Sequence, residues 1–411
     1  MLVEEAILST ILKEPYLLND SDLKAEYFQS VENRNLFHNM KELAAQGKPI
    51  DMITLITQGD IESFGGAGKL NKIAPQANVS KFDNYVELLI EKWQEKEKLN
   101  ILEIAKYENW SLDRITKTLS DLVSSKVDDY KSINDLVMSV AEAPWNAKEI
   151  PAGVATGLKS LQLATNGWQN GNLIIVAARP SMGKTDVMLH LAKHAGWNNC
   201  IPIVFSLEMN AESLRDRLIA SIGSYNRNKM KDLYNRLTDQ QKNTWMKTLG
   251  EVSKTSIQIF DKSGQTVPEM RMKVRKIKNE NPGKQVVVFI DYLTLIKPTN
   301  DYKGNMHLAT SDISKGLKAM AKEFSCPVIS LAQLSRSVEK RNDKRPLLSD
   351  LRESGSIEED ADIVMFLYRD SYYTKKEDDN SLELIIAKNR DGEVGTINAN
   401  YNKFTGVIND V

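Results

Sequence analysis

The octapeptide ARPSMGKT at residues 178–185 stands between an apolar run at residues 173–177 and a helical pattern that begins with Val187. This order of strand, turn and helix is the setting of a phosphate-binding loop. Backbone N–H groups and the helix N-terminus would face phosphate oxygens, Lys184 would reach the terminal phosphates, and the Thr185 hydroxyl would ligate magnesium. The stretch therefore predicts a nucleotide-binding protein.

Two positions depart from the usual phosphate-loop pattern. Ala178 stands where the first glycine is usual, and Asp186 places an acid directly after Thr185. Neither change removes a catalytic group. The alternative is an ordinary strand-to-helix turn that contains Gly-Lys-Thr by chance, and the flanking apolar patterns disfavour it.

Length and charge indicate an ordinary globular chain of two domains. The 411 residues exceed the size at which a single hydrophobic core usually stops growing. The chain carries 54 basic and 55 acidic residues, so its formal net charge is -1. Any contact with nucleic acid must therefore come from local basic patches and not from the charge of the whole chain.

Cysteine use and hydropathy predict a cytoplasmic protein. Cys200 and Cys326 lie within or beside apolar runs and lack metal-ligand spacing, so we expect buried thiols, no disulfide and no zinc. The sequence has no apolar run of about eighteen residues, and its N-terminus has acids where a signal peptide has a basic segment. Export and membrane insertion are therefore not expected.

Residues 1–110 show helical spacing of apolar side chains and predict an all-helical N-terminal domain. Asp51 can cap a helix, the glycine-rich residues 65–68 are expected to interrupt the pattern, and residues 82–93 mark a longer helix. The mixed charges at residues 91–98 are more typical of a solvated helix face than of a nucleic-acid surface. The first two helical patterns are carried by Ile7, Leu8, Ile11, Leu12, Leu36, Phe37, Met40 and Leu43.

Residues 111–150 are expected to form a linker with short helices. Ser132 can cap an amphipathic helix that Pro144 would end. Its apolar face has to be buried, either on the chain's own domains or on a neighbouring subunit, and the sequence alone favours neither. That face consists of Ile133, Leu136, Val137 and Val140.

Residues 151–411 alternate strand and helix patterns, which predicts an α/β domain with a mainly parallel sheet. The strand at residues 201–206 leads into Glu208. Ligands bind at the carboxyl ends of strands in open α/β sheets, so Glu208 is a candidate general base that orients the water attacking a γ-phosphate. The alternative is a helix N-terminal acid with no catalytic role.

Two more strands end in candidate site residues. The apolar run at residues 285–292 contains Asp291 near its end, where a carboxylate can hold magnesium beside Thr185. Apolar strands that end in Asp are common, and Asp291 gains its weight from following the phosphate loop within one α/β domain. The strand at residues 327–331 leads to Gln333, whose amide can contact a γ-phosphate and sense its loss.

Polar segments near the C-terminus can contact a phosphate chain. Residues 336–345 are locally basic and predict an exposed loop, for which a solvated surface is the more frequent explanation. The following residues 348–362 contain glycine, serine and arginine, which allow close approach of the backbone to a phosphate chain.

Two extended runs at residues 384–395 are joined at Asp391-Gly392 and predict a β-hairpin. Lys388 and Arg390 stand beside the turn, two residues apart and therefore on the same side of a strand. They can serve as a finger that reaches into a neighbour's nucleotide site. Charged residues on an exposed hairpin are the alternative interpretation.

The order of these motifs resembles the DnaB-type replicative helicases, a family of hexameric ring motors with a RecA-like ATPase core. The resemblance covers nearly the whole chain. The N-terminal half looks like the collar domain of that family, with GKPID at 47–51 and FGG at 64–66 as landmarks. The matching segments of the ATPase half are ARPSMGKT (178–185), SLEM (206–209), IDYL (290–293), AQLSR (332–336), LRESGSIEEDAD (351–362) and AKNRDG (387–392).

The resemblance implies roles for individual residues. Ser181, Gly183, Lys184 and Thr185 would bind the phosphates of ATP and Mg²⁺. Glu208 would activate water, Asp291 would support the metal, Gln333 would read the γ-phosphate, and Arg217 matches a nucleotide-contacting arginine. Lys388 and Arg390 match cations that a neighbouring subunit inserts, and Arg352, Glu353 and Gly355 match a central-channel loop that holds single-stranded DNA.

The resemblance also implies an activity and partners. It implies a homo-hexamer that hydrolyses ATP with Mg²⁺, moves 5′ to 3′ on single-stranded DNA and unwinds forked duplex DNA at the replication fork. A helicase loader and a primase are the expected protein partners, and the linker helix from Ser132 would dock on the adjacent ATPase domain. The compact N-terminal part fits a phage or mobile-element helicase.

One departure and two alternative classes accompany this resemblance. Asp186 stands where the family usually has a small or hydroxylated residue, and is expected to weaken binding of magnesium-nucleotide. A RecA-like recombinase or regulatory ATPase would share the phosphate loop, but the helical collar, linker helix and late hairpin disfavour it. A non-enzymatic ring would require lost catalysis, and the catalytic residue types are all present.

Overall fold

In the computed structural model, the chain forms two compact units, residues 1–148 and 149–411. The predicted linker helix from Ser132 to Pro144 lies outside the described residues, apart from Ile133, Val137 and Met138. The structure describes residues 2–21, 23–112, 114–115, 118–119, 133, 137–138, 153–300, 302, 304–351, 355–376 and 379–411.

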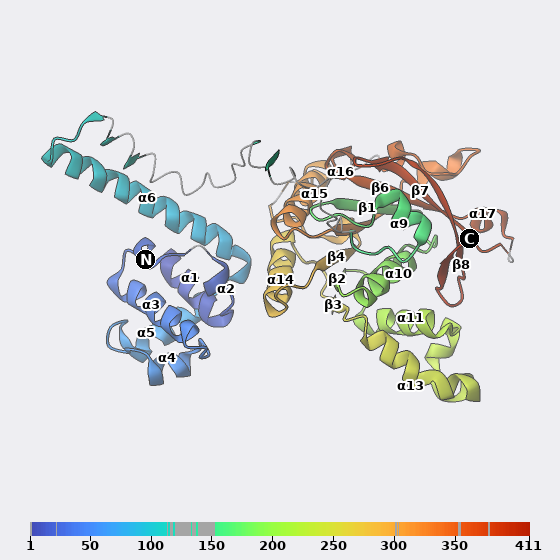
Figure 1. The fold of residues 1–411 in the computed structure, drawn as a ribbon, viewed down its shortest axis with the longest axis horizontal. Coiled ribbons are helices and arrows are strands. Elements are labelled where there is room, and N and C mark those ends of the chain that lie inside the picture. The colour runs from blue at the N-terminus through green and yellow to red at the C-terminus, as the bar shows by residue number, and fades with distance from the viewer. Residues whose placement is uncertain are drawn as a thin grey trace. The chain divides into compact units, whose positions relative to one another are not determined.

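The described part of the N-terminal unit is all helical, as the apolar spacing predicts (Figure 1). Ser30 and Asp51 cap the third and fourth helices, because their side chains accept hydrogen bonds from the backbone N–H groups of Asn33 and Thr54. The helices are α1 (Leu2–Lys13), α2 (Leu17–Asp20), α3 (Val31–Ala45), α4 (Met52–Gln58), α5 (Gly66–Ile73) and α6 (Phe82–Tyr107).

Of the glycine-rich residues 65–68, only Gly65 lies in the break between α4 and α5. Gly65 has a φ of 91°, in the left-handed region that glycine adopts at low cost, and is the N-cap of α5. The helix then starts at Gly66 and runs through the remaining glycines. The expectation that residues 65–68 interrupt the pattern was wrong for residues 66–68, because the buried side chains of Leu70 and Ile73 stabilise the helix.

The C-terminal unit is built on one nine-stranded sheet in the order β3-β2-β4-β5-β1-β6-β7-β8-β9. The strands from β3 to β6 pair in parallel, and β6 through β9 pair antiparallel. This confirms the predicted α/β class with a mainly parallel sheet. The strands are β1 (Leu173–Ala178), β2 (Ile201–Ser206), β3 (Gln258–Phe260), β4 (Val286–Asp291), β5 (Val328–Gln333), β6 (Ile363–Tyr368), β7 (Ser381–Asn389), β8 (Gly395–Tyr401) and β9 (Ile408–Asp410).

Helices cover both faces of this sheet (Figure 1). Alternate residues of β1 enter two different cores, with Ile175 packed in the core of α14 and α15 and Val176 in that of α10. Burial on both faces explains the continuous apolar runs of the central strands. The helices are α9 (Lys159–Thr165), α10 (Lys184–Trp197), α11 (Ala211–Gly223), α12 (Leu233–Arg236), α13 (Asp239–Ser253), α14 (Val267–Glu280), α15 (Met306–Glu323), α16 (Gly355–Asp360) and α17 (Asp370–Thr374).

A helical subdomain between β2 and β3 was not predicted from the sequence. It contains α11, the 3-10 helix η5 (Arg227–Lys231), α12 and α13, and has a small core of its own around Ile219, Tyr225 and Leu237. Thr238 begins α13 with a reciprocal capping box. The subdomain matters for function because Arg217 and Arg227 extend from it into the cavity described below.

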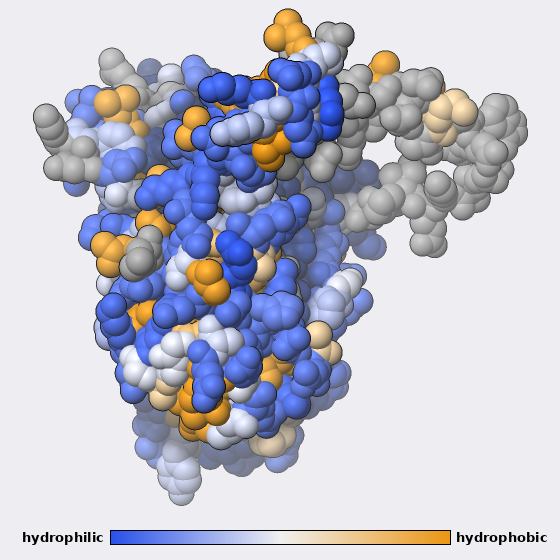
Figure 2. Space-filling view, turned by 90° about the vertical axis from the view of Figure 1, so that its left-hand side faces the viewer, coloured by the Kyte–Doolittle hydropathy of each residue, from blue (hydrophilic) through white to orange (hydrophobic). Residues whose placement is uncertain are grey.

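The surface is predominantly hydrophilic on the face shown in Figure 2, with hydrophobic side chains scattered among polar ones. Among the described residues, no helix is both long enough and apolar enough to cross a lipid bilayer.

Candidate nucleotide-binding site

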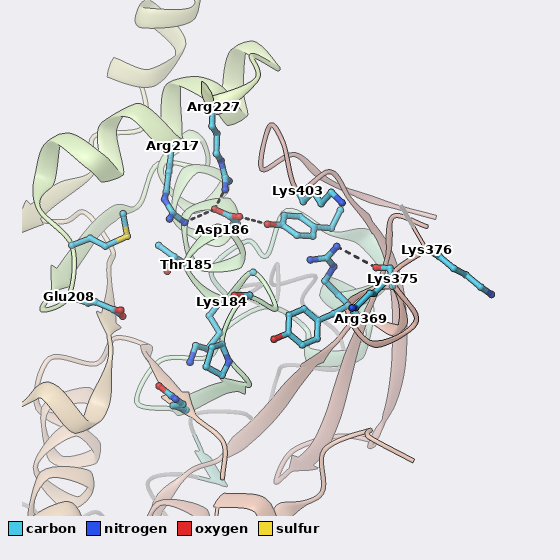
Figure 3. Close-up of a pocket in the computed structure, with 18 residues that line it drawn as sticks. Lys184, Thr185, Asp186, Glu208, Arg217, Arg227, Arg369, Lys375, Lys376 and Lys403 are labelled. Atoms are coloured by element: carbon cyan, nitrogen blue, oxygen red, sulfur yellow. Dashed lines mark hydrogen bonds and ion pairs between the residues drawn. The ribbon is translucent and has the colours of Figure 1, made fainter. Parts of the chain in front are cut away.

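A cavity of about 800 Å³ opens at the carboxyl ends of the parallel strands (Figure 3). Its wall combines the phosphate loop after β1, Glu208 after β2, the end of β5 and the residue that follows β6. The sequence-predicted residues that it brings together are Ser181, Gly183, Lys184, Thr185, Glu208, Arg217 and Gln333.

The phosphate loop has the backbone shape that its sequence predicts. Ser181 and Gly183 have positive φ values of 66° and 98°, and Gly183 is the N-cap of α10. A Cβ on Gly183 would lie 3.2 Å from the ring of Tyr401, so this position favours glycine for both its φ and its contact. The loop and the N-terminus of α10 line the cavity, and a helix N-terminus is a favourable place for phosphate oxygens.

Lys184 is a partly buried cation at the base of the loop. Its Nζ donates to the carbonyl oxygens of Ala178 at 3.3 Å and Ala332 at 3.2 Å. Burial lowers the pKa of Lys184, while the carboxylates of Asp291 and Glu208 act in the opposite direction. The ammonium is therefore held between β1 and β5 with two acids close enough to stabilise its charge.

Thr185 and Asp291 meet directly, as the sequence predicts. The Thr185 hydroxyl donates to Asp291 Oδ2 at 2.9 Å. Burial raises the pKa of Asp291, and the hydrogen bond from Thr185 opposes that rise. A hydroxyl and a carboxylate are ligands that Mg²⁺ accepts, with phosphate oxygens and waters completing its shell. No group of three His, Cys, Asp or Glu among the described residues offers an alternative metal site.

Glu208 lies on the wall of the cavity opposite Arg369 and Lys403 (Figure 3). A turn after β2 places it there, and Ser206 Oγ stabilises the turn by donating to the Met209 carbonyl oxygen at 2.6 Å. The carboxylate is exposed and stands free to accept a hydrogen bond from water. Gln333 ends β5 and also faces the cavity.

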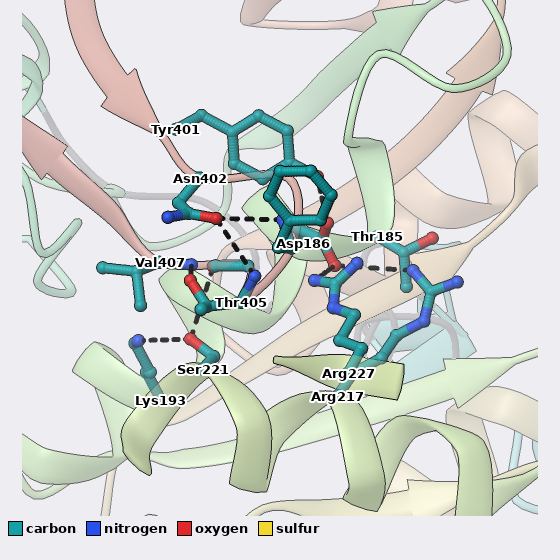
Figure 4. A network of polar contacts seen from close by, with 12 residues as sticks. Thr185, Asp186, Lys193, Arg217, Ser221, Arg227, Tyr401, Asn402, Thr405 and Val407 are labelled. Carbon is teal, nitrogen blue, oxygen red and sulfur yellow. Dashed lines mark hydrogen bonds and ion pairs between the residues drawn. The ribbon is translucent and has the colours of Figure 1, made fainter. Parts of the chain in front are cut away.

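Asp186 does not face the base of the loop. Its buried carboxylate contacts the hydroxyl of Tyr401 and the guanidinium groups of Arg217 and Arg227 (Figure 4). Asp186 therefore lines the cavity as an acid whose charge these partners neutralise, and not as a free carboxylate.

Seven basic or aromatic residues of the cavity wall were not predicted from the sequence. They come from segments far apart in the chain, and the topology that joins them is not visible in local patterns. One signal was available, because a buried acid directly after the phosphate loop requires cationic partners from elsewhere. These seven residues are Arg227, Arg369, Tyr372, Lys375, Lys376, Tyr401 and Lys403.

Lys388 and Arg390 lie at the opposite end of the sheet from this cavity. Arg390 contacts Asp362 at 3.2 Å, and Asp362 also accepts from the backbone N–H of Leu173 at the start of β1. The phosphate loop follows the other end of β1, about 17 Å away at the usual rise per residue. Both cations also donate to the Glu359 carbonyl oxygen, so they point the same way, as predicted. They are not part of their own chain's cavity.

The predicted DNA-binding residues are only partly described. Arg352 and Glu353 lie outside the described residues, and Gly355 is the first residue of α16. In the basic segment before them, Arg341 contacts Asp350 at 2.7 Å and Arg345 contacts Glu383 at 2.7 Å. These acids neutralise part of the basic loop.

The two halves of the chain match two family models. Residues 1–91 match the DnaB-like helicase N terminal domain, and residues 153–409 match the DnaB-like helicase C terminal domain. The chain belongs to the DnaB-like helicase family. The predicted resemblance is thereby confirmed, and with it the class of ATP-dependent helicase.

Individual members of the DnaB-like helicase family match over nearly the full length. The replicative DNA helicase DnaB of Geobacillus stearothermophilus is 35% identical, with 98% of this chain and 94% of that protein covered. The replicative DNA helicase DnaC of Bacillus subtilis is 34% identical with the same coverage. A solved DnaB-like replicative helicase, described with its interactions with primase, has a TM-score of 0.65 at 36% identity and covers 100% of this chain and 99% of its own.

A second solved structure, which is an isolated ATPase domain, matches only part of the chain. It is 44% identical, has a TM-score of 0.64, and covers 69% of this chain and 99% of its own. This similarity agrees with the assignment of ATPase activity, typical of the DnaB-like helicase family, to the unit that contains the cavity.

Proposed function

We propose that the protein is a replicative helicase that hydrolyses ATP to move 5′ to 3′ along single-stranded DNA and unwinds the duplex at a fork. The observation that carries this proposal is the cavity, where the phosphate loop, Glu208, the Thr185–Asp291 pair and Gln333 converge. Family membership supplies the link from ATP turnover to DNA unwinding.

Each residue has a defined task in the proposed reaction. Lys184 stabilises negative charge on the terminal phosphates, and Glu208 accepts a proton from the attacking water and orients it. Thr185 and Asp291 hold Mg²⁺, which would neutralise charge on the phosphate oxygens. Gln333 contacts the γ-phosphate and responds to its loss by moving with the end of β5.

We infer a ring of six subunits in which each ATP site is shared between two chains. The support is the position of Lys388 and Arg390 at the end of the sheet opposite their own cavity. Subunits that pack head to tail would bring this end of one chain to the cavity of the next, and such contacts close into rings. Arg390 would then stabilise the transition state in trans.

DNA is proposed to bind through loops at residues 336–355. Arg352, Glu353 and Gly355 belong to the segment that resembles the channel loop of the family, and Arg336 and Lys340 are exposed on the preceding loop. Such contacts to the phosphate backbone do not depend on base sequence and weaken as salt rises. A primase is the proposed partner, since a solved relative is described with its interactions with primase, and a loader is proposed with it.

The deciding experiment is unwinding of a forked DNA duplex with a free 5′ tail in the presence of ATP and Mg²⁺. Unwinding by the native chain and its loss in Lys184→Ala would support the proposal. A duplex that has only a 3′ tail serves as the control for direction. If DNA stimulates the ATPase activity and the protein exchanges strands without unwinding, the result would contradict the helicase proposal and favour a recombinase.

A further inference from the structure

Asp186 is an acid buried in the wall of the cavity. Only 4% of the residue is exposed, although it follows Thr185 in the first turn of α10. Its carboxylate oxygens are shared among three side chains from three other elements, Arg217 on α11, Arg227 on η5 and Tyr401 on β8 (Figure 4). Asp186 therefore connects three other elements of the site and is part of its structural framework.

This position creates an electrostatic conflict for a nucleotide site. A carboxylate in the first helical turn interacts favourably with the positive end of α10, which is the same end that would attract phosphates. It also repels the phosphates and competes with them for nearby cations. An uncompensated Asp186 would therefore weaken nucleotide binding and would draw Arg217 away from its ligand.

The two arginines contact Asp186 to different extents. Arg227 Nη2 lies 2.5 Å from Asp186 Oδ1, whereas Arg217 Nη1 lies 3.4 Å from the same oxygen. The backbone N–H of Arg227 donates to the Phe404 carbonyl oxygen at 2.9 Å. This hydrogen bond fixes the backbone of Arg227 relative to the loop after β8. The Arg217 side chain is 34% exposed, compared with 25% for Arg227 and 3% for Asp186. Arg227 is therefore the close partner and Arg217 the loosely held one.

Tyr401 connects this network to the phosphate loop. Its hydroxyl donates to Asp186 Oδ2, and its ring packs against Gly183. Burial and the charge of Asp186 both raise the pKa of Tyr401, so its hydroxyl remains a donor at neutral pH. Asp186 Oδ2 is thus occupied by Tyr401, and Asp186 Oδ1 has Arg227 as its closer partner.

We propose that Arg227 is the counter-ion of Asp186 and a positioning residue for nucleotide binding. It neutralises Asp186 and thereby leaves Arg217 available for the phosphates of ATP. This inference rests on the proposed function, because it takes the cavity to be the ATP site.

The test compares Arg227→Ala, Asp186→Ala and the double variant in the full-length protein. Binding of a fluorescent N-methylanthraniloyl ATP analogue with Mg²⁺ gives the affinity, and steady-state ATPase gives kcat and KM. We expect Arg227→Ala to weaken binding about tenfold and to raise KM with little change in kcat, because an unpaired carboxylate near the phosphates acts mainly on binding.

The double variant gives the decisive result. Asp186→Ala should bind the analogue at least as tightly as the native chain, and Asp186→Ala combined with Arg227→Ala should restore native affinity. If Arg227 instead contacts the nucleotide itself, the double variant will bind as weakly as Arg227→Ala, and the proposal is overturned. Equal affinity of all the variants would also overturn it.

Two controls separate this inference from other effects. Arg215→Ala removes an exposed arginine of α11 that contacts Asp216, and should bind the analogue with native affinity. Thermal melting identifies loss of fold in Arg227→Ala, and the double variant, which buries no unpaired charge, tests the proposal even if that single variant unfolds. A native protein that fails to bind the analogue would overturn the proposed function itself.

Discussion

Glu208 differs from the other acids of the site in its exposure. Asp291 is buried and hydrogen-bonded to Thr185, and Asp186 is paired with arginines, whereas Glu208 is exposed at the cavity wall. Three carboxylates in one site therefore have three environments, which suits them to three tasks. Only the exposed one is placed to accept a proton from water.

Replacement of Glu208 by Gln should separate binding from chemistry. The amide keeps the shape of the side chain but cannot accept the proton, so we expect ATP turnover to fall about a hundredfold or more. Affinity for a non-hydrolysable ATP analogue should change little, measured by fluorescence titration. A loss of affinity equal to the loss of turnover would assign Glu208 a role in binding.

Cys326 should be inert toward thiol reagents in the folded protein. Burial raises the pKa of its thiol to about 12, and the reactive form is the thiolate. We expect iodoacetamide at pH 8 to modify it at least about a hundredfold more slowly than in the urea-unfolded chain. Peptide mass spectrometry after timed quenching measures both rates, and rapid labelling of the folded chain would contradict the burial.

At the scale of elements, the strands themselves were easier to predict from the sequence than their pairing with one another. The run at residues 173–177 is apolar throughout because both of its faces are covered, and this signal is local. By contrast β3 and β9 have only three residues each, and β3 pairs with β2, which lies far from it in the sequence. Tyr401 enters the site only because β8 pairs antiparallel with β7. No local sequence pattern could therefore identify Tyr401 as a site residue.

The same limit explains which site residues were found. The phosphate loop, Glu208 and Asp291 each stand at the end of a recognisable strand, and strand ends meet at one edge of a parallel sheet. Arg227 comes from a helical subdomain that has no strand signal, and its partner Asp186 was taken as a neighbour of the phosphates. The contact of Asp186 with Arg227 is a tertiary property of the chain.

The hairpin of β7 and β8 gives a prediction for mixed assemblies. Lys184→Ala lacks the phosphate-site lysine but keeps its finger, and Arg390→Ala has the converse defect. Each variant alone should be almost inactive. If each site combines two chains, as proposed, random mixing at equal amounts should restore about a quarter of the sites. ATPase activity after mixing and reassembly measures the recovery, and no recovery would indicate that Arg390 acts within its own chain.

Helix α10 should make the protein sensitive to acid. Burial lowers the pKa of His194 from its usual value to about 4, with Lys193 adding to the effect. The unfolded chain binds this proton at higher pH than the folded chain does, so stability declines as pH falls from about 6.5 to about 4. His194→Gln should reduce this decline by about 1 kcal/mol, given that the ring is only partly buried.

Urea unfolding at pH 7 and pH 4.5 measures this difference. A native chain and a His194→Gln chain that lose equal stability between these pH values would show that another group is responsible. His190 packs against His194 with ring centroids 4.5 Å apart, and burial also lowers its pKa, so His190→Gln is the matched comparison.

At the scale of the whole molecule, the two units have separate cores. One core joins the helices of the N-terminal unit, and the sheet of residues 149–411 has its own cores on two faces. A shortened chain of residues 149–411 should therefore fold alone and bind a fluorescent ATP analogue with affinity within about threefold of the full chain.

Its turnover should depend on concentration. If sites require a neighbouring chain, specific ATPase activity of residues 149–411 should rise as the protein concentration rises and its subunits associate. Activity per chain across a dilution series, with mass determined by light scattering, measures this. Constant specific activity from monomer to oligomer would contradict the shared site.

The separation of Lys388 and Arg390 from their own cavity bears on how the proposed ring would take up a DNA strand that has no free end. Opening one interface between neighbouring subunits would leave one cavity without the Lys388 and Arg390 of a neighbour. It would also leave one such pair of cations without a cavity to enter. Every other boundary keeps both halves. Such a gapped ring would continue to turn over ATP while the strand passes through the gap.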